Sequence, residues 1–268
     1  MFGAVIGDML GGGFAERATR SYKLTLAECE RRLTFNTVMT AAVCDMLCYT
    51  AEPPSGRIDR AIRTREVCDL LKKYARLYPE LIPANRSAWA DHRKREHCIA
   101  QADFSPVFTV GCAYVSGKLE DVLALTELFC VYICDTDEAR SCAKAVNSAV
   151  WALRNGAEKD NIAEYVVGLA PPDESRDVAE ELSMKRTPEA AVLAAFEAFG
   201  RSYDYDSALR YAISYGAMSP TVAAAAGALA GEYYKSLPEA LEAPCRKELG
   251  AALKIPIERF EGKYVIKA

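Results

Sequence analysis

Two short segments of this chain combine hydroxyl and amide side chains at spacings that suit a polar site. Residues 34–37 read T-F-N-T, and residues 218–221 read M-S-P-T at the start of an alanine-rich run. Hard divalent cations such as Mg²⁺ require charged oxygen ligands, which neither segment supplies. The threonine hydroxyls therefore remain as helix caps and helix contacts, or as part of the lining of a ligand pocket.

Four carboxylates are the remaining candidates for acid–base chemistry. Asp8 interrupts an apolar, glycine-rich segment, which predicts a buried, hydrogen-bonded carboxylate that organises a turn over residues 7–13. Glu16 follows shortly after this segment. Asp135 and Asp137 lie near an apolar helix end, where they form either an acidic site or a solvated cluster at a helix N-terminus.

Other common sites find no support in the sequence. The chain has ten cysteines and two histidines but no C-x-x-C pair, so a zinc site is not predicted. The glycine run at residues 11–13 has no lysine in P-loop register, and no G-x-S-x-G segment occurs. We interpret the cysteines as free thiols that act as small core residues in a reducing cytoplasm.

Charge and hydropathy exclude further classes. The 268 residues carry a net charge of −4, which gives no basic field for nucleic acid or an anionic membrane. The run of charged residues over 92–97 is interpreted as a solvated loop. No uncharged apolar run approaches the roughly 20 residues that span a bilayer. We therefore expect a cytoplasmic protein with neither nucleic acid nor membrane as its partner.

Helical periodicity dominates the chain and predicts the elements that must position these side chains. Only residues 255–266 show strand character, and residues 83–105 form one long irregular region. Helices are predicted over residues 37–49, 59–78 (with Ile62, Val67, Leu70, Leu71 and Tyr74 inward), 119–134, 139–155, 160–169, 188–200, 207–214, 221–234 and 238–253. The pattern indicates a single all-α domain over residues 1–268.

Three segments in register resemble the ADP-ribosylglycohydrolase family. Residues 1–11 resemble its opening G-A-I-I-G-D-x-x-G, residues 34–40 its T-D-D-T-x-M-T, and residues 216–231 its G-G-D-T-D-T-x-A-A-x-A-G-A-L-A-G. Residues 114–166, 188–212 and 233–238 add similarity in the same order. The resemblance implies a single-domain orthogonal helical bundle of that family's type.

The family's chemistry implies two Mg²⁺ ions that hold the ribose of ADP-ribose and position water at its anomeric carbon. Their ligands are the aspartates and threonines of the second and third motifs, and an early glutamate has a catalytic or water-orienting role. Here Phe35, Asn36, Met218 and Pro220 stand at aspartate positions. Ala15 stands at the glutamate, with Glu16 one place later. Mg²⁺ is thus expected for the family but lacks its ligands in this chain.

Three hypotheses follow from this departure. The one we favour is a pseudoenzyme that binds an ADP-ribose-like small molecule, or serves as an interaction module, through the old cleft. The second is an active hydrolase with relocated groups, for which Asp8, Glu16, Asn36 or the pair Asp135 and Asp137 are the candidates. The third is a purely structural role. The bulk of Phe35, Met218 and Pro220 is expected to fill the vacated metal site. The predicted cleft comprises Thr34, Phe35, Asn36, Thr37, Asp135, Met218, Ser219 and Thr221.

Overall fold

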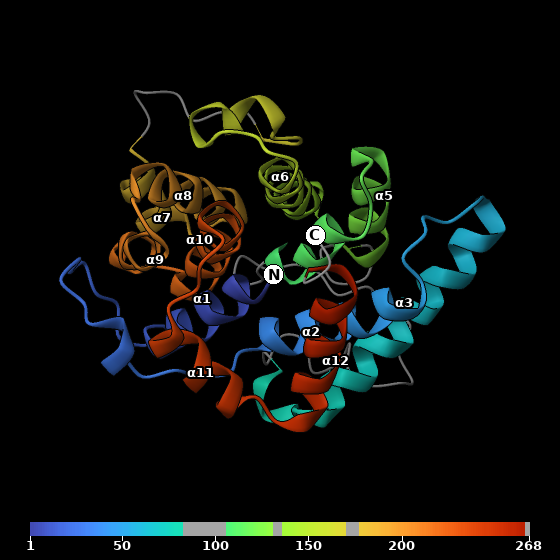
Figure 1. Cartoon of the computed structure of the whole chain (residues 1–268), viewed down its shortest axis with the longest axis horizontal. Coiled ribbons are helices and arrows are strands. Elements are labelled where there is room, and N and C mark those ends of the chain that lie inside the picture. Colours follow the sequence, from blue (N-terminus) through green and yellow to red (C-terminus); the bar gives the residue numbers. More distant parts are fainter. Residues whose placement is uncertain (83–105, 131–135, 170–176, 266–268) are drawn as a thin grey trace.

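Helices make up all the regular structure in the described part of this computed structural model (Figure 1). The structure describes residues 1–82, 106–130, 136–169 and 177–265, and these contain no strand. The all-α prediction is therefore confirmed. The irregular region predicted over residues 83–105 and the candidate Asp135 lie outside the described residues.

The described part of the chain contains α-helices and shorter 3₁₀ segments. The α-helices are α1 (Phe2–Gly13), α2 (Phe35–Tyr49), α3 (Arg57–Leu77), α5 (Leu119–Cys130), α6 (Asp137–Arg154), α7 (Val178–Lys185), α8 (Pro188–Arg201), α9 (Tyr205–Ser214), α10 (Ser219–Tyr234), α11 (Glu239–Glu248) and α12 (Ala251–Tyr264). Four 3₁₀ segments join them: η1 (Leu26–Glu28), η2 (Pro79–Leu81), η4 (Pro106–Tyr114) and η5 (Lys159–Tyr165).

The most extensive helix pair is α1 with α10, which packs the first helix of the chain against a helix late in the sequence at the centre of the bundle (Figure 1). Gly3, Gly7 and Gly11 recur every four residues on α1 and face α10. A Cβ atom at Gly7 would lie only 2.0 Å from the carbonyl oxygen of Ala223. Glycine costs about 1 kcal/mol in a helix interior, and this close packing offsets that cost. The prediction of a turn over residues 7–13 is wrong, because α1 continues through Gly13.

Two groups of helices flank this central pair. On one side α8 and α9 pack against α10, and on the other α2 packs against α12, η4 and α3 (Figure 1). The buried apolar side chains of these helices form one continuous cluster. The pocket described below lies where α1 and the first turns of α2 and α10 meet.

The C-terminal segment differs from its predicted structure. Residues 251–264 form α12, not a strand, because Leu253, Ile257 and Phe260 recur at helical spacing and are buried. The helix predicted over residues 238–253 is interrupted around Leu249 and Gly250, so that α11 and α12 replace it.

Two further predicted helices need correction. In α3, Val67, Leu71 and Tyr74 are buried as predicted and Leu70 is half-buried, but Ile62 is 54% exposed. The N-terminal half of α3 extends beyond the neighbouring described helices (Figure 1), and its apolar residues Ile58 and Ile62 are exposed. Residues 159–165 form only the 3₁₀ segment η5. No helix in the described part of the chain is long and apolar enough to cross a membrane.

Candidate functional site

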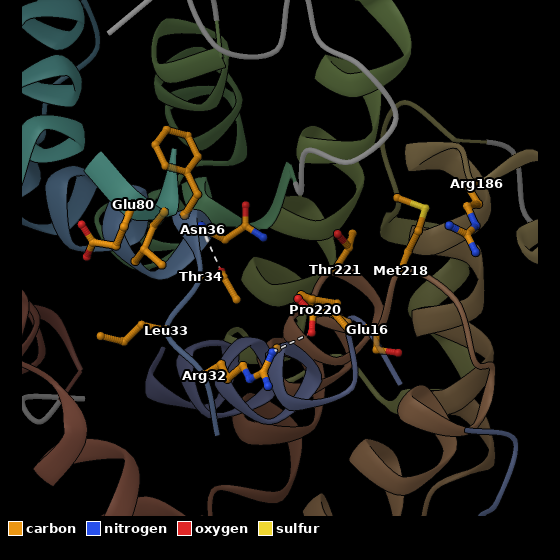
Figure 2. A pocket seen from close by; sticks show the side chains of 15 residues that line it. Glu16, Arg32, Leu33, Thr34, Asn36, Glu80, Arg186, Met218, Pro220 and Thr221 are labelled. Carbon is orange, nitrogen blue, oxygen red and sulfur yellow. Dashed lines mark hydrogen bonds and ion pairs between the residues drawn. The ribbon is translucent and has the colours of Figure 1, made fainter. Parts of the chain in front are cut away.

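A pocket of about 500 Å³ opens between the N-terminal ends of α2 and α10. Figure 2 shows Thr34 and Asn36 on one side of it, with Thr221, Met218 and Arg186 on the other. The lining comprises Gly12, Ala15, Glu16, Arg32, Leu33, Thr34, Phe35, Asn36, Glu80, Leu81, Arg186, Met218, Ser219, Pro220 and Thr221. This is the place where the two polar segments of the sequence meet.

The structure brings together most of the predicted cleft. Six of its residues line the pocket: Thr34, Phe35, Asn36, Met218, Ser219 and Thr221. Thr37 is fully buried behind the pocket wall. The expectation that apolar bulk fills the vacated site is wrong. Phe35 packs into the core and Met218 packs against its edge, so open space remains in front of them. That these residues bind a ligand stays a prediction.

The α2 side of the pocket is built around Asp8. This carboxylate accepts hydrogen bonds from the hydroxyls of Thr34 and Thr37, both at 2.5 Å, and from the Asn36 side-chain amide at 3.3 Å. Asp8 is only 2% exposed, and this burial raises its pKa against the opposing effect of the three hydrogen bonds. As predicted, it is a buried, hydrogen-bonded carboxylate, although it anchors the start of α2 and not a turn.

Thr34 links Asp8 to the N-terminus of α2. Its Oγ1 donates to Asp8 and also accepts a hydrogen bond from the Asn36 backbone N–H at 3.1 Å, which caps the helix. Asp8 is not among the residues that line the pocket. Its oxygens are engaged by three donors, so it is poorly placed to remove a proton from a ligand.

The α10 side of the pocket is organised differently. Met218 precedes the helix with φ 47° and ψ 34°, a left-handed conformation that is costly for a side chain other than glycine, and its side chain provides no cap. Pro220 in the first turn has no N–H to donate. Ser219 and Thr221 are 2% and 3% exposed, and their hydroxyls form no hydrogen bond with any described residue.

Charged side chains surround the pocket mouth. Arg32 forms ion pairs with Glu16 at 3.2 Å and with Glu30 at 2.8 Å. Glu80 and Arg186 line the pocket as well, and Arg186 ends α7 in a left-handed conformation at φ 48°. Glu16 is therefore an exposed residue of the rim that is paired with Arg32, and this position does not suit it to replace the family's early glutamate.

Of the acidic pair proposed as an alternative site, only Asp137 lies among the described residues, so the pair itself stays a prediction. Asp137 is almost fully exposed, forms an ion pair with Arg140 and does not line the pocket. Thr136 provides the N-cap of α6 through its hydroxyl, which accepts from the Ala139 N–H. This arrangement agrees with a solvated helix start.

Sequence reasoning missed five residues that line the pocket: Arg32, Leu33, Glu80, Leu81 and Arg186. Arg32 and Leu33 directly precede the T-F-N-T segment, so their neighbourhood was a usable signal. Glu80 follows α3 and Arg186 ends α7, and neither position carries a pattern that marks it. Their place at the pocket results from the packing of distant helices.

The donor set does not fit the two Mg²⁺ ions that the family motifs imply. The motif residues on the lining offer hydroxyls, one amide, a thioether and a proline ring, all of them neutral, and two divalent cations need anionic oxygens. The two carboxylates of the lining, Glu16 and Glu80, lie outside the motif positions, and Glu16 is paired with Arg32. Among the described residues, no group of three or more His, Cys, Asp or Glu side chains is placed to hold a metal.

Comparison with known proteins agrees with the fold and the motifs. No curated protein matches this chain. A solved structure described as an ADP-ribosylglycohydrolase-related protein complex is similar with a TM-score of 0.67 and 17% identity, over 97% of this chain and 93% of that chain. At this identity the likeness shows the fold alone. The family model of the ADP-ribosylglycohydrolases matches residues 1–263. This chain therefore belongs to the ADP-ribosylglycohydrolase family.

Proposed function

We propose that this chain is a pseudoenzyme of its family that binds an ADP-ribose-like ligand without metal. The observation that carries the proposal is a pocket that persists at the family's motif positions although the motif residues that line it are neutral. The loss of four carboxylates removes the charge that would hold two divalent cations. The space between Asn36 and Met218 is left for a ligand.

The size and lining of the pocket support a small molecule as its occupant. A volume of about 500 Å³ lies within the range typical of small-molecule sites. Its lining combines apolar groups from Leu33, Phe35 and Met218 with polar groups from Asn36 and Thr221. A few polar groups on an otherwise apolar wall are what a ligand with both a ring system and hydroxyls requires.

A second candidate function is hydrolysis with relocated carboxylates. The observation in its favour is that Glu16 and Glu80 both line the pocket, and glycoside hydrolysis needs two carboxyl groups. Against it, Glu16 is exposed and paired with Arg32. We therefore retain the non-catalytic role as the proposal and use hydrolysis as an outcome of its test.

Calorimetric titration with ADP-ribose tests the proposal, in EDTA and in excess Mg²⁺. We expect binding in EDTA and the same affinity in Mg²⁺, with no metal retained by the purified protein. Binding only in Mg²⁺, or no binding at millimolar ADP-ribose, would overturn it. Release of ADP-ribose from a modified arginine or serine peptide in EDTA would favour the second candidate.

A matched pair of variants locates the binding. Asn36→Ala removes a polar group of the pocket wall, and we expect it to weaken ADP-ribose binding about tenfold. Thr40→Val alters a buried hydroxyl on the same helix outside the pocket lining and is expected to leave the affinity unchanged. Equal effects from both variants would place the ligand elsewhere.

A further inference from the structure

Two hydroxyls on the pocket wall are left without a partner. Ser219 and Thr221 are both more than nine-tenths buried, and neither hydroxyl forms a hydrogen bond within the described residues. Their hydroxyl oxygens are not completely enclosed by protein, because both residues line the pocket. Figure 2 shows the Thr221 side chain directed into the space between Asn36 and Met218. A buried hydroxyl without a protein partner indicates that a ligand or solvent satisfies it.

The backbone at the same place also presents free donors. Ser219 and Thr221 lie in the first turn of α10, whose N–H groups have no acceptor within the helix. The Met218 side chain provides no cap for them. The sixteen residues of α10 add the positive end of a helix dipole at this point. Hydroxyl and amide donors therefore converge on one volume.

On the α10 side of that volume the nearest charge without a described ion pair is the Arg186 guanidinium, which suits an oxyanion better than a cation (Figure 2). Arg186 lines the pocket, and no ion pair engages it among the described residues. Arg32 is occupied by Glu16 and Glu30 at the rim. Glu80 lies on the lining near the Asn36 side, and it is the one carboxylate there without a described ion pair. Asp8 lies outside the lining, with its oxygens held by Thr34, Thr37 and Asn36.

We infer that the first turn of α10 is an oxyanion subsite that binds a phosphate group, with Ser219 and Thr221 as donors and Arg186 as the counter-charge. The subsite lies at the positions where the family motif carries metal-binding aspartates. The family motif binds cations there, whereas this chain would bind an anion. The inference rests on the proposed ligand pocket and names the chemistry that its α10 wall recognises: a phosphorylated small molecule, held by its phosphate.

Pyrophosphate, inorganic phosphate and ribose are the probes, titrated in EDTA and followed by calorimetry. We expect the two phosphates to bind and to compete with ADP-ribose, and ribose to bind far more weakly. Thr221→Val removes one donor to a charged group and is expected to weaken pyrophosphate about tenfold. Arg186→Ala is expected to weaken it about threefold. Its neighbour Lys185, which is paired with Glu181 and does not line the pocket, provides the control Lys185→Ala with no change.

A gain of affinity gives the sharper test. Pro220→Ala adds an N–H group to the first turn of α10, and we expect pyrophosphate to bind about threefold more tightly. Unchanged or weaker binding by a folded Pro220→Ala protein would overturn the subsite, even where Thr221→Val fails to fold. If Thr221→Val and Pro220→Ala both bind ADP-ribose with unchanged affinity, the subsite is overturned and the proposed function stands. Failure of ADP-ribose and pyrophosphate alike would overturn both.

Discussion

The two walls of the pocket have lost the same kind of side chain but have been rebuilt in opposite ways. On the α2 wall, the hydroxyls of Thr34 and Thr37 and the Asn36 amide all donate to Asp8. On the α10 wall, Ser219 and Thr221 have no partner among the described residues. Similar residue types thus form a closed polar network on one side and an open set of donors on the other.

The difference separates structural residues from available ones. A polar group that is already satisfied gains little from a ligand, whereas a buried unsatisfied group gains a full hydrogen bond. The hydroxyls of the α2 wall are therefore expected to contribute mainly to the stability of the fold, and only the side-chain oxygen of Asn36, which accepts no hydrogen bond from a described residue, is left for a ligand. The α10 wall is expected to contribute to binding and little to stability. The predictions below test this division.

The largest effect is expected where both walls are displaced together. In Gly7→Ala the new Cβ would lie 2.0 Å from the Ala223 carbonyl oxygen, so α1 and α10 must separate. We expect a loss of about 3 kcal/mol or more in the free energy of unfolding. Gly200→Ala, at an exposed position in α8 with nothing near the new Cβ, is the control and is expected to stabilise by about 0.5–1 kcal/mol. Denaturant titration measures both.

The next effect contrasts the two walls directly. Asp8→Ala leaves three donors without their acceptor, and we expect a loss of about 2–4 kcal/mol in the free energy of unfolding. Thr221→Val removes a hydroxyl that has no described partner, and we expect a change within about 0.5 kcal/mol. Losses of the same size in both variants would contradict the division between the walls.

A smaller effect is expected from the titration of Asp8. Burial raises the folded-state pKa of this carboxyl above its ordinary value of 3.8, so the folded state favours the protonated form. The stability that this contributes is present below pH 3.8 and is lost as pH rises through the raised pKa. Relative to Asp8→Asn, which does not titrate, the wild type should therefore lose stability as pH increases from 4 to 8. A flat difference between the two denaturation series would contradict this expectation.

The smallest effect concerns the backbone of the α10 wall. Met218 adopts a left-handed conformation that glycine accepts without steric cost. Because the half-buried Met218 side chain also contributes some packing, we expect Met218→Gly to raise the free energy of unfolding by only about 0.5 kcal/mol. Met218→Ala keeps the strain and removes the packing, so it should destabilise. Thermal and denaturant melts of the two variants distinguish these contributions.

Much of the fold could be predicted because its signals are local. Apolar residues at helical spacing placed most helices, and the motif register placed Thr34, Asn36 and Thr221 at one site. The prediction for the C-terminal segment was wrong because residues 255–266 were interpreted as a strand, whereas Leu253, Ile257 and Phe260 form the buried face of α12. The predicted burial of Ile62 was wrong because periodicity identifies the apolar face of a helix but does not show whether another element covers that face.

The sequence by itself determined the all-helical class, the order of the motifs and the loss of four carboxylates, since residue identity and spacing express these directly. The tertiary structure alone decided that the vacated site stays open, that Glu80 and Arg186 reach it, and which hydroxyls are satisfied. Burial and hydrogen bonding depend on contacts between segments far apart in the chain. The approach of Gly7 to Ala223, which joins α1 to α10, is one such contact and helps to set the distance between the two walls.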